Sequence, residues 1–242
     1  MIIDLIKKNI PEYKITLPVS NKKCSFRPLL VKEEKYFSII TNISSTFEDR
    51  MTNLCSMVDS CFDNKLKSSL LPIPDFQFIL NSIRQKSIGE TSKIKLTCPY
   101  TKEQVLVNLN LNSVSTQKSQ KEFSLKIKED FLMTFRCPRI TDILEFSTFP
   151  ETDEDYFSLV SKCLVEIETP SEKINVENDD ILEKNKYIEL VEKSKYKEVK
   201  EFVCNSSIKF KIEYKTSDET DREIEVDDFV NFLKFYLVIL TL

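Results

Sequence analysis

The sequence of 242 residues contains no histidine. Catalysis by serine–histidine–aspartate or cysteine–histidine groups is therefore excluded, and so is any metal site with an imidazole ligand. Gly89 is the one glycine. Phosphate-binding loops and the dinucleotide fingerprint need several glycines, because the backbone approaches phosphate closely there, so neither motif is present. Enzymes without histidine exist, so these absences argue against an enzyme without excluding one.

Charge and hydropathy disfavour two further classes. Thirty-five Lys and Arg residues against 39 Asp and Glu residues give a net charge of −4, whereas nucleic-acid binding rests largely on neutralising phosphate. No apolar run reaches the roughly 18 to 20 residues that span a bilayer, and the opening "MIIDLIKKNI" lacks the pattern of a secretory signal. We expect a cytoplasmic protein with no nucleic-acid partner and no membrane span.

The seven cysteines are scattered and odd in number, which is typical of reduced, buried residues in a cytoplasmic protein. One of them suggests a metal site. "LTCPYTKEQV" (residues 96–105) has the form of a zinc knuckle, Cys-Pro-x-Cys between two strands, but Thr101 occupies the second cysteine position. Structural zinc takes four thiolate or imidazole ligands, so Cys98 in a chain without histidine predicts a metal-free hairpin and no cofactor.

The apolar patterns predict an α+β fold in which helices pack with small antiparallel hairpins or sheets in two lobes. The first lobe, 1–112, is expected to hold strands over 13–19 and 22–30, helices over 29–43 and 51–62, a helix that begins near its cap Asp75, and a hairpin over 92–111. Gly89 follows the third helix, where a left-handed cap is expected.

The polar segment 113–122 is the expected linker between the lobes. In the second lobe, 123–242, we expect strands over 122–127 and 131–140, helices over 142–146, 155–167 and 181–203, a loop over 170–180, a hairpin over 207–226 and a closing helix over 227–240. The last hairpin loosely repeats the earlier one, since Tyr214 and Ser217 stand at the same three-residue step as Cys98 and Thr101. A true repeat and a chance likeness both explain this.

The order of three segments resembles the baseplate hub assembly proteins of T-even-like contractile-tailed phages. They are "ITLPVSNKKCSFRPLLVKEEKYF" (15–37), "LPIPDFQFILNSIRQKSIGE" (71–90) and "KIKLTCPYTKEQVLVNLNL" (93–111). The "FRP", "KEE" and "R-x-KS-x-GE" elements carry the likeness, which continues more weakly through "FLMTFRCPRITDI" and "VDDFVNFL". It implies a late viral protein that helps to build the hub of the baseplate in the host cytoplasm.

In many members of that family the two hairpins carry Cys-x-x-Cys pairs that look zinc-binding. Here Thr101, Tyr214 and Ser217 stand where three of the four thiolates would be. The resemblance therefore implies degenerate, metal-free, knuckle-like hairpins.

Candidate interface residues lie in two kinds of segment. In "FRPLLVKEEKY" (26–36) we expect Arg27 to pair with an acidic group, either within the fold, at Glu33 or Glu90, or on a partner; the same question applies to Arg84. The closing helix is apolar on nearly every side, so it is buried in its own domain or by another chain. The predicted interface residues are Phe26, Arg27, Lys32, Glu33, Arg84, Phe232, Phe235, Tyr236, Ile239 and Leu240.

The function that follows from the resemblance is that of a non-enzymatic, chaperone-like assembly factor. It would bind hub or tape-measure proteins, with self-association through the closing helix as a further contact. One alternative is a permanent structural hub subunit located in the virion tail baseplate. The other is a histidine-free enzyme of unrecognised fold, which would show a cleft of converging polar groups.

Overall fold

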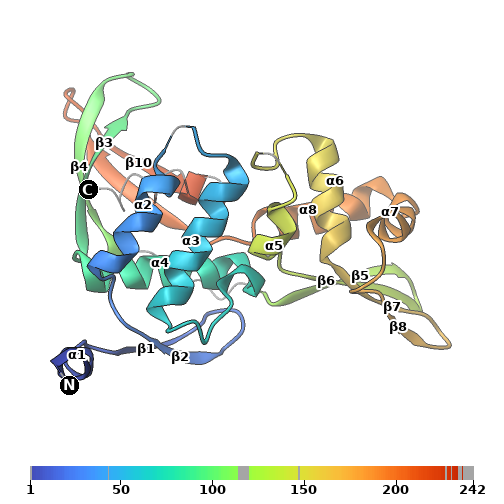
Figure 1. Ribbon diagram of the computed structural model, residues 1–242. Coiled ribbons are helices and arrows are strands. Elements are labelled where there is room, and N and C mark those ends of the chain that lie inside the picture. The colour runs from blue at the N-terminus through green and yellow to red at the C-terminus, as the bar shows by residue number, and fades with distance from the viewer. Residues whose placement is uncertain are drawn as a thin grey trace.

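The computed structural model describes residues 2–42, 44–113, 120–146, 148–226, 228, 229, 231–233 and 236. Helices and small antiparallel sheets make up this part of the chain, which confirms the α+β class predicted from the sequence. Figure 1 shows them in two groups, with the helices and hairpins of the first part of the chain and its last hairpin on one side, and another sheet with its helices on the other.

Three helices form the centre of the first group. They are α2 (Glu34–Ile40), α3 (Phe47–Cys61) and α4 (Ile73–Ser87). α3 begins after Thr46, whose hydroxyl accepts a hydrogen bond from the Asp49 N–H at 3.0 Å and so caps the first turn. α4 is buried over most of its length, including polar side chains, so it is the central helix of the group.

Short hairpins surround these helices. α1 (Ile2–Lys8) leads into the hairpin of β1 (Tyr13–Thr16) and β2 (Lys23–Phe26), and α4 is followed by the hairpin of β3 (Thr91–Thr97) and β4 (Gln104–Asn110). In the β3–β4 hairpin Ile94 pairs with Val107, and both side chains are buried. Gly89 precedes β3 with a φ of +135°, and its amide donates to the Arg84 carbonyl, as expected for a glycine after a helix.

The second group is built on a four-stranded antiparallel sheet. Its strands, in spatial order, are β5 (Glu122–Lys128), β6 (Phe131–Arg136), β7 (Leu164–Glu168) and β8 (Lys173–Asn175). The helices of this group are α5 (Ile140–Ile143), α6 (Asp153–Cys163), α7 (Ile181–Glu189) and α8 (Lys193–Cys204). Figure 1 shows α5–α8 above the sheet, so the sheet supports one helical layer.

The end of the chain returns to the first group. The hairpin of β9 (Phe210–Lys215) and β10 (Asp221–Val226) lies beside β3 and β4 (Figure 1). Just before it, the Ile208 amide donates to Gln77 Oε1 at 2.8 Å, so the segment leading into this hairpin is bonded to α4. Residues 114–119 of the predicted linker lie outside the described residues, and the division into lobes at 113–122 stays a prediction.

Several predicted elements differ from those observed. The helix predicted over 155–167 ends at Cys163, and the chain continues as β7, whose pairing with β6 is a tertiary contact that local periodicity does not reveal. The predicted loop 170–180 contains β8, and the helix predicted over 181–203 is interrupted between α7 and α8. The strand predicted over 22–30 ends at Phe26, and the helix that follows it consists of a 3-10 turn, Val31–Glu33, and α2.

The start of α4 also differs from prediction. The helix begins at Ile73, and Asp75 lies within its first turn instead of capping it. The Asp75 carboxylate is buried and accepts hydrogen bonds from the amides of Val19 and Ser20, at 2.7 and 3.0 Å. It therefore fixes the turn between β1 and β2, a role that depends on tertiary structure.

The closing helix is described only in part. Phe229, Phe232, Leu233 and Tyr236 are buried, and Tyr236 bonds through its hydroxyl to Asn81 of α4. Asp228 and Asn231 are also described, but 227, 230, 234, 235 and 237–240 of this predicted helix, with Phe235, Ile239 and Leu240 among them, lie outside the described residues, as does Ile43 of the first predicted helix. No helix in the described ranges is long and apolar enough to cross a membrane.

Candidate functional site

The turns of the two knuckle-like hairpins meet in the structure. The Tyr214 hydroxyl donates to Cys98 Sγ at 3.3 Å, and the Thr101 amide donates to the same sulfur at 3.5 Å. Ser217 binds the Glu103 carboxylate through its amide at 2.8 Å and its hydroxyl at 2.6 Å. The four positions at which the resemblance places thiolates are thus brought to one junction between the hairpins.

The electrostatics of this junction centre on the Cys98 sulfur. Burial raises the pKa of Cys98, but hydrogen bonds from Thr101, Tyr214 and the Tyr100 backbone outweigh it and lower the pKa to about 7. Burial and the bond to Cys98 raise the pKa of Tyr214 to about 12. Across the described chain no group of three or more acidic or cysteine side chains is placed to hold a metal ion. The bonds of Tyr214 to Cys98 and of Ser217 to Glu103 join the hairpins, but one sulfur and three hydroxyls do not form a zinc ligand set.

A buried ion pair joins β2 to the start of α2. Arg27 contacts Glu33 through both guanidinium nitrogens, Nη2 to Oε1 at 3.0 Å and Nη1 to Oε2 at 3.2 Å. Ser60 Oγ and the Leu30 amide also donate to Glu33, at 2.7 and 2.8 Å. This confirms the pairing with Glu33 inside the fold that the sequence suggested for Arg27. Burial raises the pKa of Glu33, but the hydrogen bonds from Arg27, Ser60 and Leu30 bring it below its ordinary value.

Most of the predicted interface residues are buried in this chain. Arg84 donates to the Gly89 carbonyl at 3.0 Å, Phe232 and Tyr236 stack at 4.3 Å, and Phe26 lies between the rings of Tyr13 and Phe62. The buried members of the set are Phe26, Arg27, Glu33, Arg84, Phe232 and Tyr236. Lys32 is exposed. Contacts of these residues with a partner stay a prediction.

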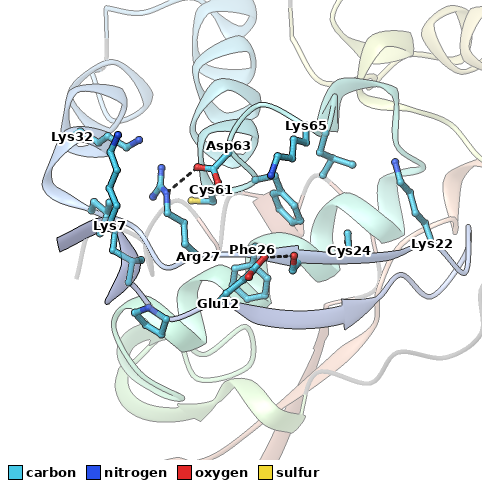
Figure 2. A pocket seen from close by; sticks show the side chains of 16 residues that line it. Lys7, Glu12, Lys22, Cys24, Phe26, Arg27, Lys32, Cys61, Asp63 and Lys65 are labelled. Carbon is cyan, nitrogen blue, oxygen red and sulfur yellow. Dashed lines mark hydrogen bonds and ion pairs between the residues drawn. The ribbon is translucent and has the colours of Figure 1, made fainter. Parts of the chain in front are cut away.

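A cleft of about 810 Å³ lies between α1, the β1–β2 hairpin and the end of α3. Its apolar floor includes Phe26, Phe62 and Leu66, all buried. Five cationic side chains and two carboxylates also line it: Lys7, Lys22, Arg27, Lys32 and Lys65, with Glu12 and Asp63. Figure 2 shows Lys7 and Lys32 at one end of the cleft and Lys22 and Lys65 at the other.

The charges in this cleft are only partly compensated. Arg27 is neutralised by Glu33 and also approaches Asp63, Nε to Oδ1 at 3.7 Å (Figure 2). Glu12 accepts a hydrogen bond from Ser25 Oγ. The four lysines are exposed. Among the residues that the structure describes, Lys32 alone of the four makes an ion pair, with its Nζ 3.7 Å from Oε1 of the already bonded Glu33. The cleft is therefore a positively charged site on a chain whose net charge is −4.

α1 adds an uncovered apolar face next to the cleft. Ile2, Leu5 and Ile6 are 75 %, 63 % and 61 % exposed, at the i, i+3, i+4 spacing that places them on one side of a helix. Figure 1 shows α1 set apart from the other helices. Sequence reasoning missed both α1 and the cleft. The spacing of these three residues could have indicated the helix, but the four lysines come from four separate segments and carry no common pattern.

Comparison with known proteins identifies the family. The family model described as T4 bacteriophage base plate protein matches residues 10–234, which is nearly the whole chain. Searches of curated proteins and of solved structures found no match. The match includes both knuckle-like hairpins, the buried Arg27–Glu33 pair and most of the cleft. The chain therefore belongs to the family of T4 bacteriophage base plate proteins.

Proposed function

We propose that this protein is a non-enzymatic, chaperone-like assembly factor of the phage baseplate hub. In this role it binds hub or tape-measure proteins in the host cytoplasm while the tail is built. Family membership supports the baseplate role. The observation that carries the binding role is the apolar face of α1, which the described fold leaves uncovered beside the cleft. Apolar side chains clustered on a surface and bordered by charge are typical of partner-binding sites.

The polar groups in the described fold favour binding over catalysis. Arg27 and Glu33 satisfy each other, and the Cys98 sulfur is occupied by Tyr214 and Thr101. A catalytic site needs a nucleophile or base that converges with other polar groups on open space. These two polar clusters are instead closed by contacts within the chain. The lysine-lined cleft does gather charged groups, but there Arg27 is paired with Glu33 and Glu12 with Ser25, which supports a binding site rather than a catalytic one.

The test is recovery of tail proteins from infected cells. We expect tagged protein to recover a hub or tape-measure protein, and Leu5→Ser/Ile6→Ser to recover at least about tenfold less. Leu190→Ser is the matched control, because Leu190 is 83 % exposed in the other group of elements and its replacement also removes one exposed leucine. Recovery of no tail protein by the unaltered chain would overturn the proposal.

Mass spectrometry of purified particles separates the assembly factor from the permanent hub subunit. An assembly factor should be recovered from infected cells together with tail proteins but be missing from finished particles. If peptides of this chain are found in particles at the level of other baseplate proteins, the protein is a structural subunit instead of an assembly factor, and it uses the same binding surface.

A further inference from the structure

We propose that the lysine-lined cleft and the apolar face of α1 together bind an acidic, amphipathic segment of another tail protein. The proposal rests on the proposed function, because it specifies the chemistry of the partner that the assembly factor binds. The binding surface consists of Lys7, Lys22, Lys32 and Lys65, the cleft floor, and Ile2, Leu5 and Ile6 of α1.

The charge of the cleft indicates that the ligand carries negative charge. Lys7, Lys22 and Lys65 have no ion pair within the described ranges, and Lys32 shares Glu33 with Arg27, Ser60 and Leu30. Four ammonium groups thus extend from the two ends of one cleft (Figure 2). Carboxylates spaced along a partner segment would complement them, and the acidic remainder of the chain would direct such a segment to this site.

The apolar residues indicate that the ligand also has an apolar side. Phe26, Phe62 and Leu66 line the cleft between the charged ends, and α1, which lines the cleft through Lys7, carries the exposed side chains of Ile2, Leu5 and Ile6. The partner segment would have apolar residues on one side and carboxylates on the other. Its apolar residues would pack against the cleft floor and α1, and its carboxylates would pair with the lysines. An amphipathic helix laid in a groove binds in this way.

Two features argue against a polyphosphate backbone as the ligand. Glu12 and Asp63 lie within the cleft and would repel a uniform row of phosphates, whereas a peptide can place a neutral or cationic residue opposite them. The lining also has few hydrogen-bond donors other than the lysines, Arg27 and Ser25. A polypeptide of mixed character is the occupant that fits both the charges and the floor.

A fluorescence-anisotropy titration tests the surface directly. The probe is a labelled amphipathic peptide of leucine and glutamate, with a version in which glutamine replaces glutamate as its neutral control. We expect the acidic peptide to bind, the neutral peptide to bind at least about tenfold more weakly, and added salt to weaken the acidic peptide selectively. Equal affinity for both peptides would overturn the proposal.

Charge-reversal variants locate the binding. Lys22→Glu/Lys65→Glu should weaken binding of the acidic peptide by at least about tenfold. The matched control is Lys93→Glu/Lys95→Glu, which makes the same charge change at exposed positions of β3 outside the cleft. Circular dichroism and thermal unfolding verify that both variants fold. An equal loss of affinity for the acidic peptide in the two variants would mean that only the net charge of the protein matters, and it would contradict binding in the cleft.

Recovery from infected cells separates this inference from the proposed function. If unaltered protein recovers a tail protein and Lys22→Glu/Lys65→Glu recovers it equally well, the function stands and the cleft inference fails. If the unaltered protein recovers no tail protein, the function itself fails. A photo-crosslinker placed at Ser25 should yield a tail-protein peptide rich in Asp and Glu; a peptide of this same chain, or cleft-dependent binding to phosphatidylglycerol vesicles instead, would overturn the assignment.

Discussion

The Tyr214 hydroxyl donates a hydrogen bond to the Cys98 sulfur at 3.3 Å and joins the turns of two hairpins that lie 116 residues apart in the chain. Both side chains are buried. The contact occupies the place at which paired thiolates would hold a metal in a zinc knuckle. A hydrogen bond between two side chains of the same chain thus connects the two hairpins that a metal ion would connect in a zinc knuckle.

Restoring the missing thiols should create a metal site. We expect Thr101→Cys/Tyr214→Cys/Ser217→Cys to bind zinc with Cys98, because the structure already brings these four positions to one junction. Metal analysis after dialysis gives the stoichiometry, and a chelator should lower the unfolding temperature of this variant only. The control is Thr101→Ser/Tyr214→Phe/Ser217→Ala, which changes the same positions without thiols. Stoichiometric zinc on the unaltered chain would contradict the metal-free assignment.

The Cys98–Tyr214 contact can be tested by substitution of each partner. Cys98→Ser should leave folding nearly intact, since a hydroxyl still accepts the bond from Tyr214. Cys98→Val removes the acceptor and leaves the buried phenol unpaired, so its urea midpoint should be lower. Cys98→Val/Tyr214→Phe removes both partners and should recover part of that loss, because the buried phenol hydroxyl that Cys98→Val leaves unpaired is then absent. A double variant with a urea midpoint no higher than that of Cys98→Val would show that the hydrogen bond does not contribute to stability.

Loss of the buried carboxylate should be costly. Glu33→Gln leaves the buried guanidinium of Arg27 without its charged partner and should lower the free energy of unfolding by about 3 kcal/mol. Glu34→Gln is the control, since the neighbouring Glu34 is exposed. Urea unfolding at neutral pH measures both. A loss in Glu33→Gln no greater than in Glu34→Gln would contradict the structural importance of the pair.

The same pair predicts a pH dependence. Glu33 has a lowered pKa in the folded chain, so its contribution to stability is fully present above its ordinary pKa of 4.5 and is lost as the pH falls through the folded value. The difference in unfolding free energy between the unaltered chain and Glu33→Gln should therefore be constant near neutral pH and narrow below about pH 4.5. A difference that widened toward acid pH would contradict this assignment.

Asp75 should be required for the turn between β1 and β2. Asp75→Ala leaves the amides of Val19 and Ser20 without their acceptor and should lower the free energy of unfolding by about 2 kcal/mol. Asp75→Asn keeps one acceptor oxygen and should lose less. Hydrogen exchange at Val19 and Ser20 should accelerate in Asp75→Ala. Unchanged exchange there would show that the carboxylate does not hold the turn.

Local signals predicted a large part of the fold. α3, the β3–β4 hairpin and the cap at Gly89 follow from periodicity and turn chemistry that lie within a few residues of each other. β7 was missed because its residues continue the apolar spacing of α6, and only pairing with β6 makes them a strand. Asp75 was assigned to a helix cap for the same reason: its amide donors lie more than fifty positions away.

The candidate site was less predictable than the fold. Arg27 and Glu33 are close in sequence, so their pairing could be expected. The cleft depends on how α1, the β1–β2 hairpin and the end of α3 assemble, and no single segment contains more than a part of its lysines. Phe232 and Tyr236, chosen for an interface by their chemical character, are buried by packing within the chain, and their contact with a partner stays a prediction.

The bonds from α4 to the last part of the chain set an order of events during synthesis. Gln77 and Asn81 find their partners at Ser207, Ile208 and Tyr236, more than a hundred residues later. While the ribosome is still making the four-stranded sheet β5–β8, α4 therefore has polar side chains without their later partners and apolar surface that is not yet covered. We expect this nascent chain to be protease-sensitive until the closing segment emerges, and folding to be limited by that late, non-local docking.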